Sequence, residues 1–240
     1  MSERVNFPYN AEFERNPYPG LLIAVEGLDG SGGTTQVSNL YSFFQREVPG
    51  AKIWATREPF DGPIGGFIRL ALGKRLKIDN QTLQLTFSAD RSDHLLAENG
   101  IIDRLKQAWI IICDRYSPST PAYGYAAGLD IKWLWALQSK FILPDLTFFL
   151  DLPPETCLER KKQSNFSLEL YEELETLRKT REGYELLMEM MPDLMVRIDG
   201  SRDEGLVYAR IKNEIVKLPK FQQLVAGTVN GNQGFLSSSG

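Results

Sequence analysis

The sequence is poor in the residues that most often bind metals or cross-link chains. Among its 240 residues are one histidine and two cysteines, Cys113 and Cys157, which stand in apolar surroundings without metal-site spacing. We expect them to be buried free thiols of a reducing compartment. No apolar run approaches the roughly 18 residues of a membrane span. The net charge of -4 excludes attraction of the whole molecule to nucleic acid or to an anionic membrane, so any anion site must be local.

The chain is predicted to form one domain between two irregular ends. Residues 1–20 are polar and interrupted by proline, which predicts an irregular arm and, without the apolar segment of a secretory signal, a cytoplasmic protein. Residues 218–240 end in a stretch rich in Gly, Ser and Asn and predict a flexible tail. Residues 21–217 contain neither an internal repeat nor a linker, and we expect them to fold as a unit.

Alternating apolar runs and helical-period stretches predict an α/β fold. Runs rich in branched and aromatic residues predict strands at residues 21–26, 51–56, 108–114, 145–151 and, more weakly, 194–199. Helical periodicity predicts helices at residues 34–48, 64–76, 80–107, 131–142 and 167–191. This alternation favours a five-stranded parallel sheet with helices on both faces. Ligands of such sheets bind beyond the carboxyl ends of the strands, so we look for a site there.

A glycine-rich turn, GLDGSGGTT, follows the first predicted strand. Gly27, Gly32 and Thr34 match the phosphate-loop pattern G-x-x-x-x-G-K-[ST], but Gly33 stands where the lysine belongs. Backbone N–H groups and the following helix N-terminus can bind phosphate without a side chain at position 33. The alternative is a tight strand-to-helix turn with no ligand. The nucleotide-binding residues that we predict are Gly27, Leu28, Asp29, Gly30, Ser31, Gly32, Gly33, Thr34 and Thr35.

The next two strand ends also carry groups suited to phosphoryl transfer. Arg57 lies in TREP after the second run, and Asp114 and Arg115 follow the third. With the Thr34 hydroxyl, the Asp114 carboxylate is placed to hold Mg²⁺, and the arginines can bind phosphates with two hydrogen bonds each. Each group alone could be solvated or could cap a helix. Their presence at all three strand ends favours a phosphoryl-transfer site.

Taken in order, the motifs resemble those of the thymidylate kinase (dTMP kinase) family over about residues 20–215. The matching segments are VEGLDGSG with TTQ, TREP, TFSADRSDHL, DRYSPSTPAY, PDLTFFLDLPPETCLER and IDGSRDEGLV. The resemblance implies a three-layer P-loop kinase fold with a short lid. It also implies transfer of the γ-phosphoryl group of ATP to dTMP, with ATP and Mg²⁺ as cofactors and a homodimer as the assembly.

The resemblance also implies roles for individual residues around dTMP. Those expected around the acceptor phosphate are Arg57, Arg69 and Arg115. Those expected around the nucleoside are Phe87 stacked on the base, Arg91 and Thr120 at its edge, and Tyr123 under the sugar. Asp29 would meet the 3′-hydroxyl or the metal. Phe87 could instead be core and Arg69 a surface cation, and His94 is predicted to be a polar helix-surface residue without chemistry.

Two departures from the family pattern bear on the site. The signature usually ends A-Y-Q, and here Gly124 replaces the glutamine. The missing loop lysine requires another cation, since losing one transition-state donor typically costs about 10²–10³ in rate. The lid region, residues 159–165, offers Arg160, Lys161 and Lys162, of which we favour the two lysines. These cations could also be a solvated helix end.

The sequence leaves three functions open. The first is an active dTMP kinase with small-molecule nucleotides as partners, and no nucleic acid or membrane. The second is a nucleotide-binding module without catalysis, of which Gly33 would be the sign. The third is a kinase for another pyrimidine nucleotide or nucleoside. The apolar face of residues 131–142 could belong to a dimer interface or to the core.

Overall fold

The fold is built on a five-stranded parallel sheet. The computed structural model describes residues 4–6, 11–161 and 167–226. The sheet order is β4-β5-β3-β6-β7, and all four pairings are parallel. The strands are β3 Leu21–Gly27, β4 Ile53–Arg57, β5 Ile110–Asp114, β6 Leu146–Asp151 and β7 Val196–Asp199. Each overlaps one of the predicted runs, which confirms the predicted sheet.

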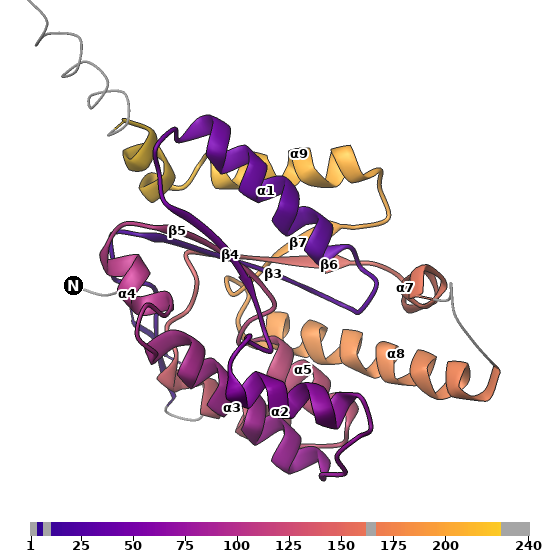
Figure 1. Ribbon diagram of the computed structural model, residues 1–240. Coiled ribbons are helices and arrows are strands. Elements are labelled where there is room, and N and C mark those ends of the chain that lie inside the picture. The colour runs from indigo at the N-terminus through magenta and orange to yellow at the C-terminus, as the bar shows by residue number, and fades with distance from the viewer. Residues whose placement is uncertain (1–3, 7–10, 162–166, 227–240) are drawn as a thin grey trace, which may run out of the picture.

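Helices cover both faces of this sheet (Figure 1). Their bounds are α1 Gly33–Glu47, α2 Pro63–Leu72, α3 Asn80–Leu96, α4 Ile101–Lys106, α5 Ser119–Ala126, α6 Ile131–Leu137, the short 3₁₀ helix η1 Gln138–Lys140, α7 Pro154–Lys161, α8 Ser167–Met190 and α9 Glu204–Ile215. The helices α1 and α9 lie on one face, and α3, α4, α5 and α8 lie on the other. The predicted three-layer α/β architecture is therefore confirmed.

Two helical predictions need correction. The predicted helix 80–107 is two helices, because the backbone is extended at Ala97, the C-cap of the first, and turns at Asn99, which has a positive φ of 57°. A Cβ on Gly100 would lie 2.7 Å from the Ala97 carbonyl oxygen, so the chain turns tightly here. Helix α5 was not among the predicted helices, because it contains Pro121 and Gly124. Pro121 is tolerated because it stands in the first turn, where its missing N–H costs no hydrogen bond.

The central strand β3 is buried on both sides. Its alternate residues Leu21, Ile23 and Val25 pack in the layer that contains α1 and α9. Leu22 and Ala24 face the opposite layer with residues of α3 and α4. This double burial explains why the strand is a continuous apolar run, as parallel strands between two helical layers usually are.

The N-terminal arm is more ordered than predicted. The strands β1 Arg4–Asn6 and β2 Glu12–Glu14 form an antiparallel pair. Phe13 is fully buried and stacks on Trp135, with ring centroids 4.5 Å apart. The prediction of an irregular segment is therefore wrong for these strands. The alternation of Glu12, Phe13 and Glu14 is the sequence signal, too short to be distinctive.

The predicted flexible tail also begins too early. Residues 219–226 are helical, and Phe221 packs against Phe43 and Phe44 of α1. Residues 227–240 lie outside the described part. Lys220 Nζ lies 2.7 Å from the Asp145 carboxylate and donates to the Asn16 carbonyl oxygen at 2.8 Å. We call Asn16, Asp145 and Lys220 the terminal clasp, because they join both ends of the described chain.

Several interior predictions can also be compared with the structure. Cys113 and Cys157 are free and buried, as expected. In the segment 131–142, Leu134 and Trp135 are fully buried, so its apolar face belongs mainly to the core. Within the described residues, the structure has no helix with the length and apolarity needed to cross a membrane.

Candidate active site

The glycine-rich turn connects β3 to α1 and packs against α7. Gly30 and Gly32 have φ values of 89° and 96°, in the left-handed region that glycine adopts without strain. A Cβ on Gly30 would also lie 2.4 Å from the Cys157 carbonyl oxygen, so no larger residue fits there. Gly32 is the N-cap of α1 and has no side chain to occupy the free N–H groups. The turn therefore presents backbone donors at a helix N-terminus, as a phosphate site requires.

The Asp114 carboxylate occupies space beside Gly33. A Cβ on Gly33 would lie 3.0 Å from Asp114 Oδ1, a tight contact that would require Asp114 to shift. Thr34 Oγ1 donates to Asp114 Oδ2 at 2.7 Å. The end of β5 therefore lies directly against the start of α1. A hydroxyl and a carboxylate side by side are the hard oxygen ligands that Mg²⁺ prefers, so these residues fit the ion that the resemblance implies.

Arg115 connects the glycine-rich turn to the neighbouring cavity. Its Nη2 donates to Asp29 Oδ1 at 2.9 Å, and its Nη1 donates to the Gly27 carbonyl oxygen and to Tyr184 Oη. Tyr123 Oη donates to the same Asp29 oxygen at 3.1 Å. Arg115 has a φ of 73°, an unusual conformation for an arginine. Its backbone N–H donates to the Val25 carbonyl oxygen, which holds this conformation in place.

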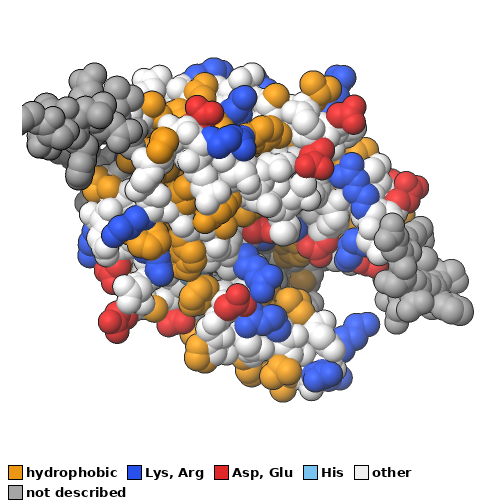
Figure 2. Space-filling view, turned by 45° about the horizontal axis from the view of Figure 1, so that its top comes forward, with side chains coloured by type: hydrophobic (Ala, Val, Ile, Leu, Met, Phe, Trp, Pro, Cys, Tyr) orange, Lys and Arg blue, Asp and Glu red, His pale blue; other side chains and the backbone are white. Residues whose placement is uncertain are grey.

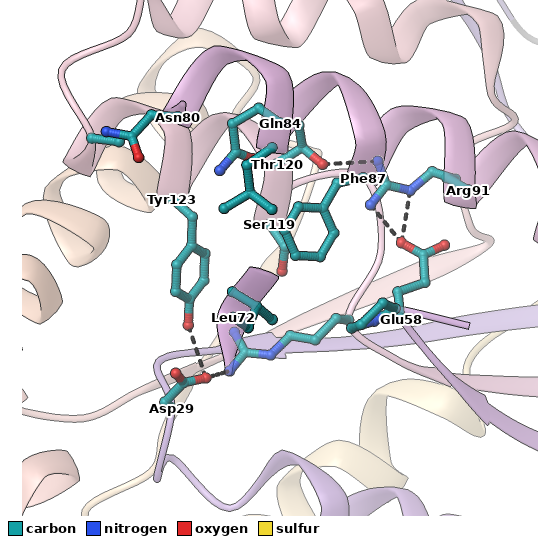
Figure 3. A pocket seen from close by; sticks show the side chains of 14 residues that line it. Asp29, Glu58, Leu72, Asn80, Gln84, Phe87, Arg91, Ser119, Thr120 and Tyr123 are labelled. Carbon is teal, nitrogen blue, oxygen red and sulfur yellow. Dashed lines mark hydrogen bonds and ion pairs between the residues drawn. The ribbon is translucent and has the colours of Figure 1, made fainter. Parts of the chain in front are cut away.

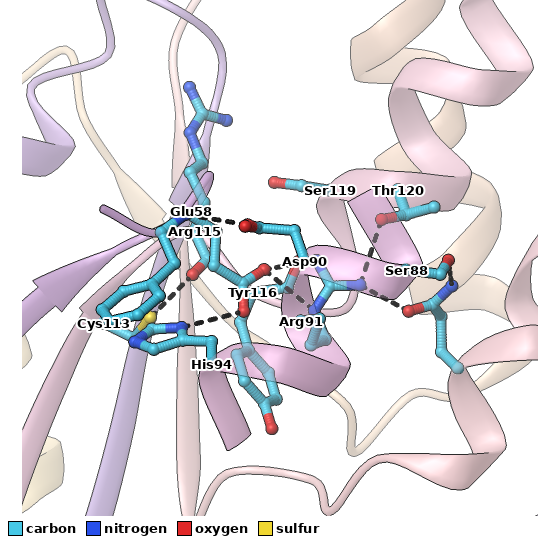
Figure 4. A network of polar contacts seen from close by, with 12 residues as sticks. Glu58, Ser88, Asp90, Arg91, His94, Cys113, Arg115, Tyr116, Ser119 and Thr120 are labelled. Atoms are coloured by element: carbon cyan, nitrogen blue, oxygen red, sulfur yellow. Dashed lines mark hydrogen bonds and ion pairs between the residues drawn. The ribbon is translucent and has the colours of Figure 1, made fainter. Parts of the chain in front are cut away.

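Arg91 is the centre of a buried polar network (Figure 4). Its side chain is 1% exposed and forms an ion pair with Glu58, with Nη2 2.5 Å from Oε2. The guanidinium also donates to Thr120 Oγ1 at 3.1 Å, to the Tyr116 carbonyl oxygen at 2.9 Å and to Gln138 Oε1. With two donations to Glu58, all five N–H groups of Arg91 have acceptors. Protein contacts thus hold Arg91 rigidly without any ligand.

A cavity of about 280 Å³ lies between α3 and α5, beside Arg115 (Figure 3). Its lining comprises Asp29, Glu58, Pro59, Leu72, Asn80, Leu83, Gln84, Phe87, Arg91, Arg115, Ser119, Thr120, Tyr123 and Ala127. Six of the predicted site residues are among them. In the space-filling view, apolar and charged side chains surround a hollow in the lower half of the molecule (Figure 2).

Two predicted phosphate-binding arginines lie outside this lining. Arg57 and Arg69 both approach the Asp61 carboxylate, each at 3.3 Å. Arg69 also donates to the Phe60 carbonyl oxygen at 3.0 Å, and both arginines are exposed. Because their partner is a surface carboxylate, these guanidinium groups can exchange it for a phosphate at small cost.

The prediction for His94 is wrong. The side chain is fully buried, and its ring stacks on Phe60 with centroids 4.3 Å apart. His94 Nε2 is hydrogen-bonded to Thr56 Oγ1 at 2.8 Å, and Nδ1 lies 3.5 Å from Glu58 Oε1. His94 is three residues after Arg91, so both side chains lie on the buried face of α3. The polarity of the intervening Ser92 and Asp93 concealed this face in the sequence.

The lid cations lie at the end of α7. Lys161 contacts Glu173, and its Nζ lies 3.8 Å from Asp29 Oδ2. Arg160 Nη1 lies 4.0 Å from the position that a Cβ on Gly32 would take, so its charge stands over the glycine-rich turn. The described residues offer Arg160 no ion-pair partner. Lys162 lies outside the described part of the chain.

Comparisons with known proteins agree with this geometry. The family model described as "Thymidylate kinase" matches residues 25–211. A Pyrococcus horikoshii protein named "Probable thymidylate kinase" is 35% identical over 207 residues, which cover 83% of this chain and 99% of the relative. A Pyrobaculum aerophilum protein of the same name is 36% identical over 201 residues, covering 84% and 99%. The chain belongs to the thymidylate kinase family.

Membership of the thymidylate kinase family makes this chain a nucleoside monophosphate kinase by class. The candidate site then has two halves: a glycine-rich turn with Thr34 and Asp114, and a cavity lined by Phe87, Arg91 and Tyr123. Arg115 stands where these halves meet, because it contacts the loop and also lines the cavity.

Glu26, a buried acid next to the candidate site, was not among the predicted site residues. Glu26 accepts hydrogen bonds from Ser119 Oγ at 2.6 Å, Tyr184 Oη at 2.8 Å and Tyr116 N–H at 2.7 Å. Burial raises the pKa of Glu26 to about 7, although Arg115 and these donors favour the carboxylate. Ser119 lines the cavity, so Glu26 fixes part of its wall. The signal was visible, since Glu26 is the lone charge in an apolar strand.

Proposed function

We propose that the chain transfers the γ-phosphoryl group of ATP to the 5′-phosphate of dTMP, giving dTDP. The observation that carries this proposal is the position of Arg115. It contacts the Gly27 carbonyl oxygen and Asp29 in the phosphate loop, and it also lines the cavity that would hold the acceptor. A phosphate bound to this guanidinium would lie between the two halves of the site. In-line transfer requires that arrangement, and phosphoryl transfer depends mainly on positioning and charge neutralisation.

On the donor side, backbone N–H groups of residues 27–35 would bind the phosphates of ATP. Thr34 and Asp114 would hold Mg²⁺, directly or through water. When bound, the ion supplies positive charge to the donor phosphates. The protein's own part is to fix the ligand oxygens, which it does through the 2.7 Å hydrogen bond between these two side chains.

On the acceptor side, Arg57, Arg69 and Arg115 would surround the dTMP phosphate. Phe87 would stack on the base, with Thr120 and Arg91 at its edge, and Tyr123 would lie under the sugar. The half-buried Phe87 ring and the Tyr123 hydroxyl both face the cavity, which supports these roles. Asp29 would meet the 3′-hydroxyl, since it already accepts from the Arg115 and Tyr123 that flank it.

The charge of the missing lysine would come from the lid. The sequence favoured Lys161 or Lys162, but Lys161 is engaged by Glu173 and Asp29. Arg160 lies over Gly32 at the start of α1 and has no such partner among the described residues, so the geometry supports Arg160. Such a cation would stabilise charge that redistributes in the transition state.

Single variants would identify this cation. We expect Arg160→Gln to lower kcat by about 10² and to change the KM for dTMP little, because the arginine acts on the transferred group. Lys161→Gln and Lys162→Gln are the matched controls. A larger loss in either lysine variant would return the role to that lysine. Adding Gly33→Lys to the Arg160→Gln variant tests whether the loop lysine restores kcat. The Asp114 carboxylate must shift to make room for the new side chain.

The reaction itself is tested by ADP release from purified protein with ATP and Mg²⁺. The acceptors compared are dTMP, dUMP, CMP and thymidine, and we expect dTMP to have the highest kcat/KM. Equal turnover of CMP would contradict the thymidylate assignment. Binding of dTMP without ADP release under any metal condition would favour a non-catalytic nucleotide-binding module.

We also propose that the protein is a cytoplasmic homodimer that needs no nucleic acid or membrane partner. Support for a dimer comes from apolar side chains exposed on the adjacent helices α2 and α3: Phe67, Leu70 and Leu85 are 39%, 46% and 41% exposed. Light scattering of the wild type and of Leu70→Asp would test this. We expect a dimer for the first and a smaller species for the second.

A further inference from the structure

The cavity wall contains a buried side-chain amide whose oxygen has no hydrogen-bond partner among the described residues. Gln84 lies on α3, is 4% exposed and lines the cavity. Its Oε1 is fully buried without a hydrogen bond, and no described residue is hydrogen-bonded to the rest of its amide. A buried acceptor without a hydrogen bond is destabilising. Burial of such a group against a cavity therefore points to a ligand that completes it.

The position of Gln84 directs its amide at the acceptor. Gln84, Phe87 and Arg91 are spaced i, i+3 and i+7, so they share one face of α3. In the close-up view the Gln84 side chain extends from α3 into the cavity beside Thr120 (Figure 3). An aromatic ring that stacks on a base thus has an amide one turn before it and a guanidinium one turn after it.

Three other polar groups of the cavity wall already form hydrogen bonds. Thr120 accepts from Arg91, Ser119 donates to Glu26, and Tyr123 donates to Asp29. All five donors of Arg91 also have acceptors. A base edge could accept a hydrogen bond from the Thr120 hydroxyl, whose proton has no acceptor among the described residues, but it could use the Arg91 and Ser119 donors only by sharing or breaking an existing hydrogen bond. The Gln84 amide can bond without such a loss.

Helix α5 leaves room for this side chain. Gly124 faces Gln84, and a Cβ there would lie 3.3 Å from Gln84 Cγ and 2.1 Å from Leu134 Cδ1. Any larger residue at position 124 would collide with Leu134 and crowd Gln84. The glycine thus allows α3, α5 and α6 to approach closely while the amide remains at the cavity wall.

We propose that Gln84 is a specificity-determining residue that hydrogen-bonds the edge of the pyrimidine base. The inference rests on the proposed function, whose acceptor is a pyrimidine deoxynucleotide. A carboxamide carries an acceptor and donors side by side. Those groups complement the N3–H donor and the neighbouring carbonyl acceptor of thymine or uracil. The base would supply the hydrogen bonds that the buried amide lacks, and the amide would bind the polar edge of the base.

The test uses Gln84→Met, which keeps the length of the side chain and removes its hydrogen bonds. We expect the dissociation constant of dTMP, measured by calorimetry, to rise at least about fivefold, because the base edge loses its partner. We expect the Tm of the nucleotide-free protein to be unchanged or higher, because an unpaired buried amide has been removed. Weaker dTMP binding without a loss of Tm separates ligand recognition from a packing role, whose removal would lower both the Tm and the affinity for dTMP. Gln81→Met, on the exposed face of the same helix, should change neither value.

A second ligand shows which part of dTMP the Gln84 side chain contacts. We expect 2-deoxyribose 5-phosphate, which lacks the base, to bind wild type and Gln84→Met equally. Unchanged dTMP affinity in Gln84→Met, equal weakening of both ligands, or a joint loss of Tm and affinity would each overturn the proposal. Failure of the proposed function looks different, since the wild-type protein itself would then bind no dTMP or release no ADP with it.

Discussion

The two halves of the site differ in how their charges are neutralised. On the acceptor side, Arg91 and Glu58 are 1% and 2% exposed, and every N–H of the arginine has a protein acceptor. On the donor side, the loop offers backbone N–H groups, and the nearby Arg160 is exposed without an ion-pair partner among the described residues. The acceptor side is therefore organised before any ligand arrives. The proposed donor side would depend on a bound nucleotide to bring its charges together.

This difference predicts that the two halves tolerate different losses. A buried ion pair cannot lose one member without leaving an unpaired charge in a poorly solvated place. An exposed cation over a glycine-rich loop can be exchanged for another, since water solvates it in the free protein. Gly33 stands on the donor side, where the charge of a missing lysine can be supplied from another element.

The largest effect on stability should follow from removing the buried ion pair of Arg91 and Glu58. Glu58→Gln leaves the Arg91 charge buried without its counter-ion, and we expect a loss of about 3–5 kcal/mol in the free energy of unfolding. Urea denaturation at neutral pH measures this. A loss below about 1 kcal/mol would show that Gln138, Thr120 and the Tyr116 carbonyl suffice to hold the guanidinium.

The pH dependence of stability should report the titration of Glu26, which lies beside Arg115. Burial raises its pKa from 4.5 to about 7, so the folded protein binds this proton more tightly than the unfolded chain does. The contribution to stability is therefore fully present below pH 4.5 and falls by about 3 kcal/mol as pH rises to about 7. Denaturation from pH 4.5 to 7.5 should show a flatter profile in Glu26→Gln than in wild type. The exposed Glu47→Gln should keep the wild-type slope.

Arg115→Ala tests the residue that joins the halves. Because charge-assisted hydrogen bonds contribute roughly 1.5–3 kcal/mol, we expect kcat/KM for dTMP to fall at least about tenfold. Steady-state ADP release measures this effect, and circular dichroism checks the fold. A folded variant with wild-type kcat/KM would remove Arg115 from the site.

The smallest effect on stability should follow from removing the exposed ion pairs of Asp61. Asp61→Asn removes the shared carboxylate of Arg57 and Arg69, whose contacts with Asp61 are 3.3 Å long and open to solvent. We expect the free energy of unfolding to change by less than about 1 kcal/mol. A loss comparable to that of Glu58→Gln would contradict the contrast between buried and exposed charges.

Much of the sheet and the loop could be predicted because their signals are local. Each strand is a short apolar run, and the glycines of the loop stand between a strand and a helix, where their spacing is informative. Topology then places Arg57, Asp114 and Arg115 at one edge, because the carboxyl ends of parallel strands meet there. The roles assigned to individual site residues stay predictions until the variants are measured.

Features that depend on distant partners could not be predicted in this way. His94 appeared to be a surface residue because its neighbours in sequence are polar, whereas its ring packs on Phe60 from another segment. Phe13 packs against Trp135, more than a hundred residues later in the chain, and Phe221 packs against α1. Helix α5 was missed because proline and glycine lower its propensity, which packing against α8 and α6 overrides.

The terminal clasp gives the chain a mechanical property. Lys220 holds the Asp145 carboxylate and the Asn16 carbonyl, and Asp145 also accepts from the Leu22 N–H at the start of the central strand. Handles attached beyond residues 16 and 220 would therefore pull on neighbouring anchor points at the amino ends of the strands. Tension between them would act on the packing of Phe13 and Phe221 and on the clasp, which lies at the strand ends opposite the phosphate loop.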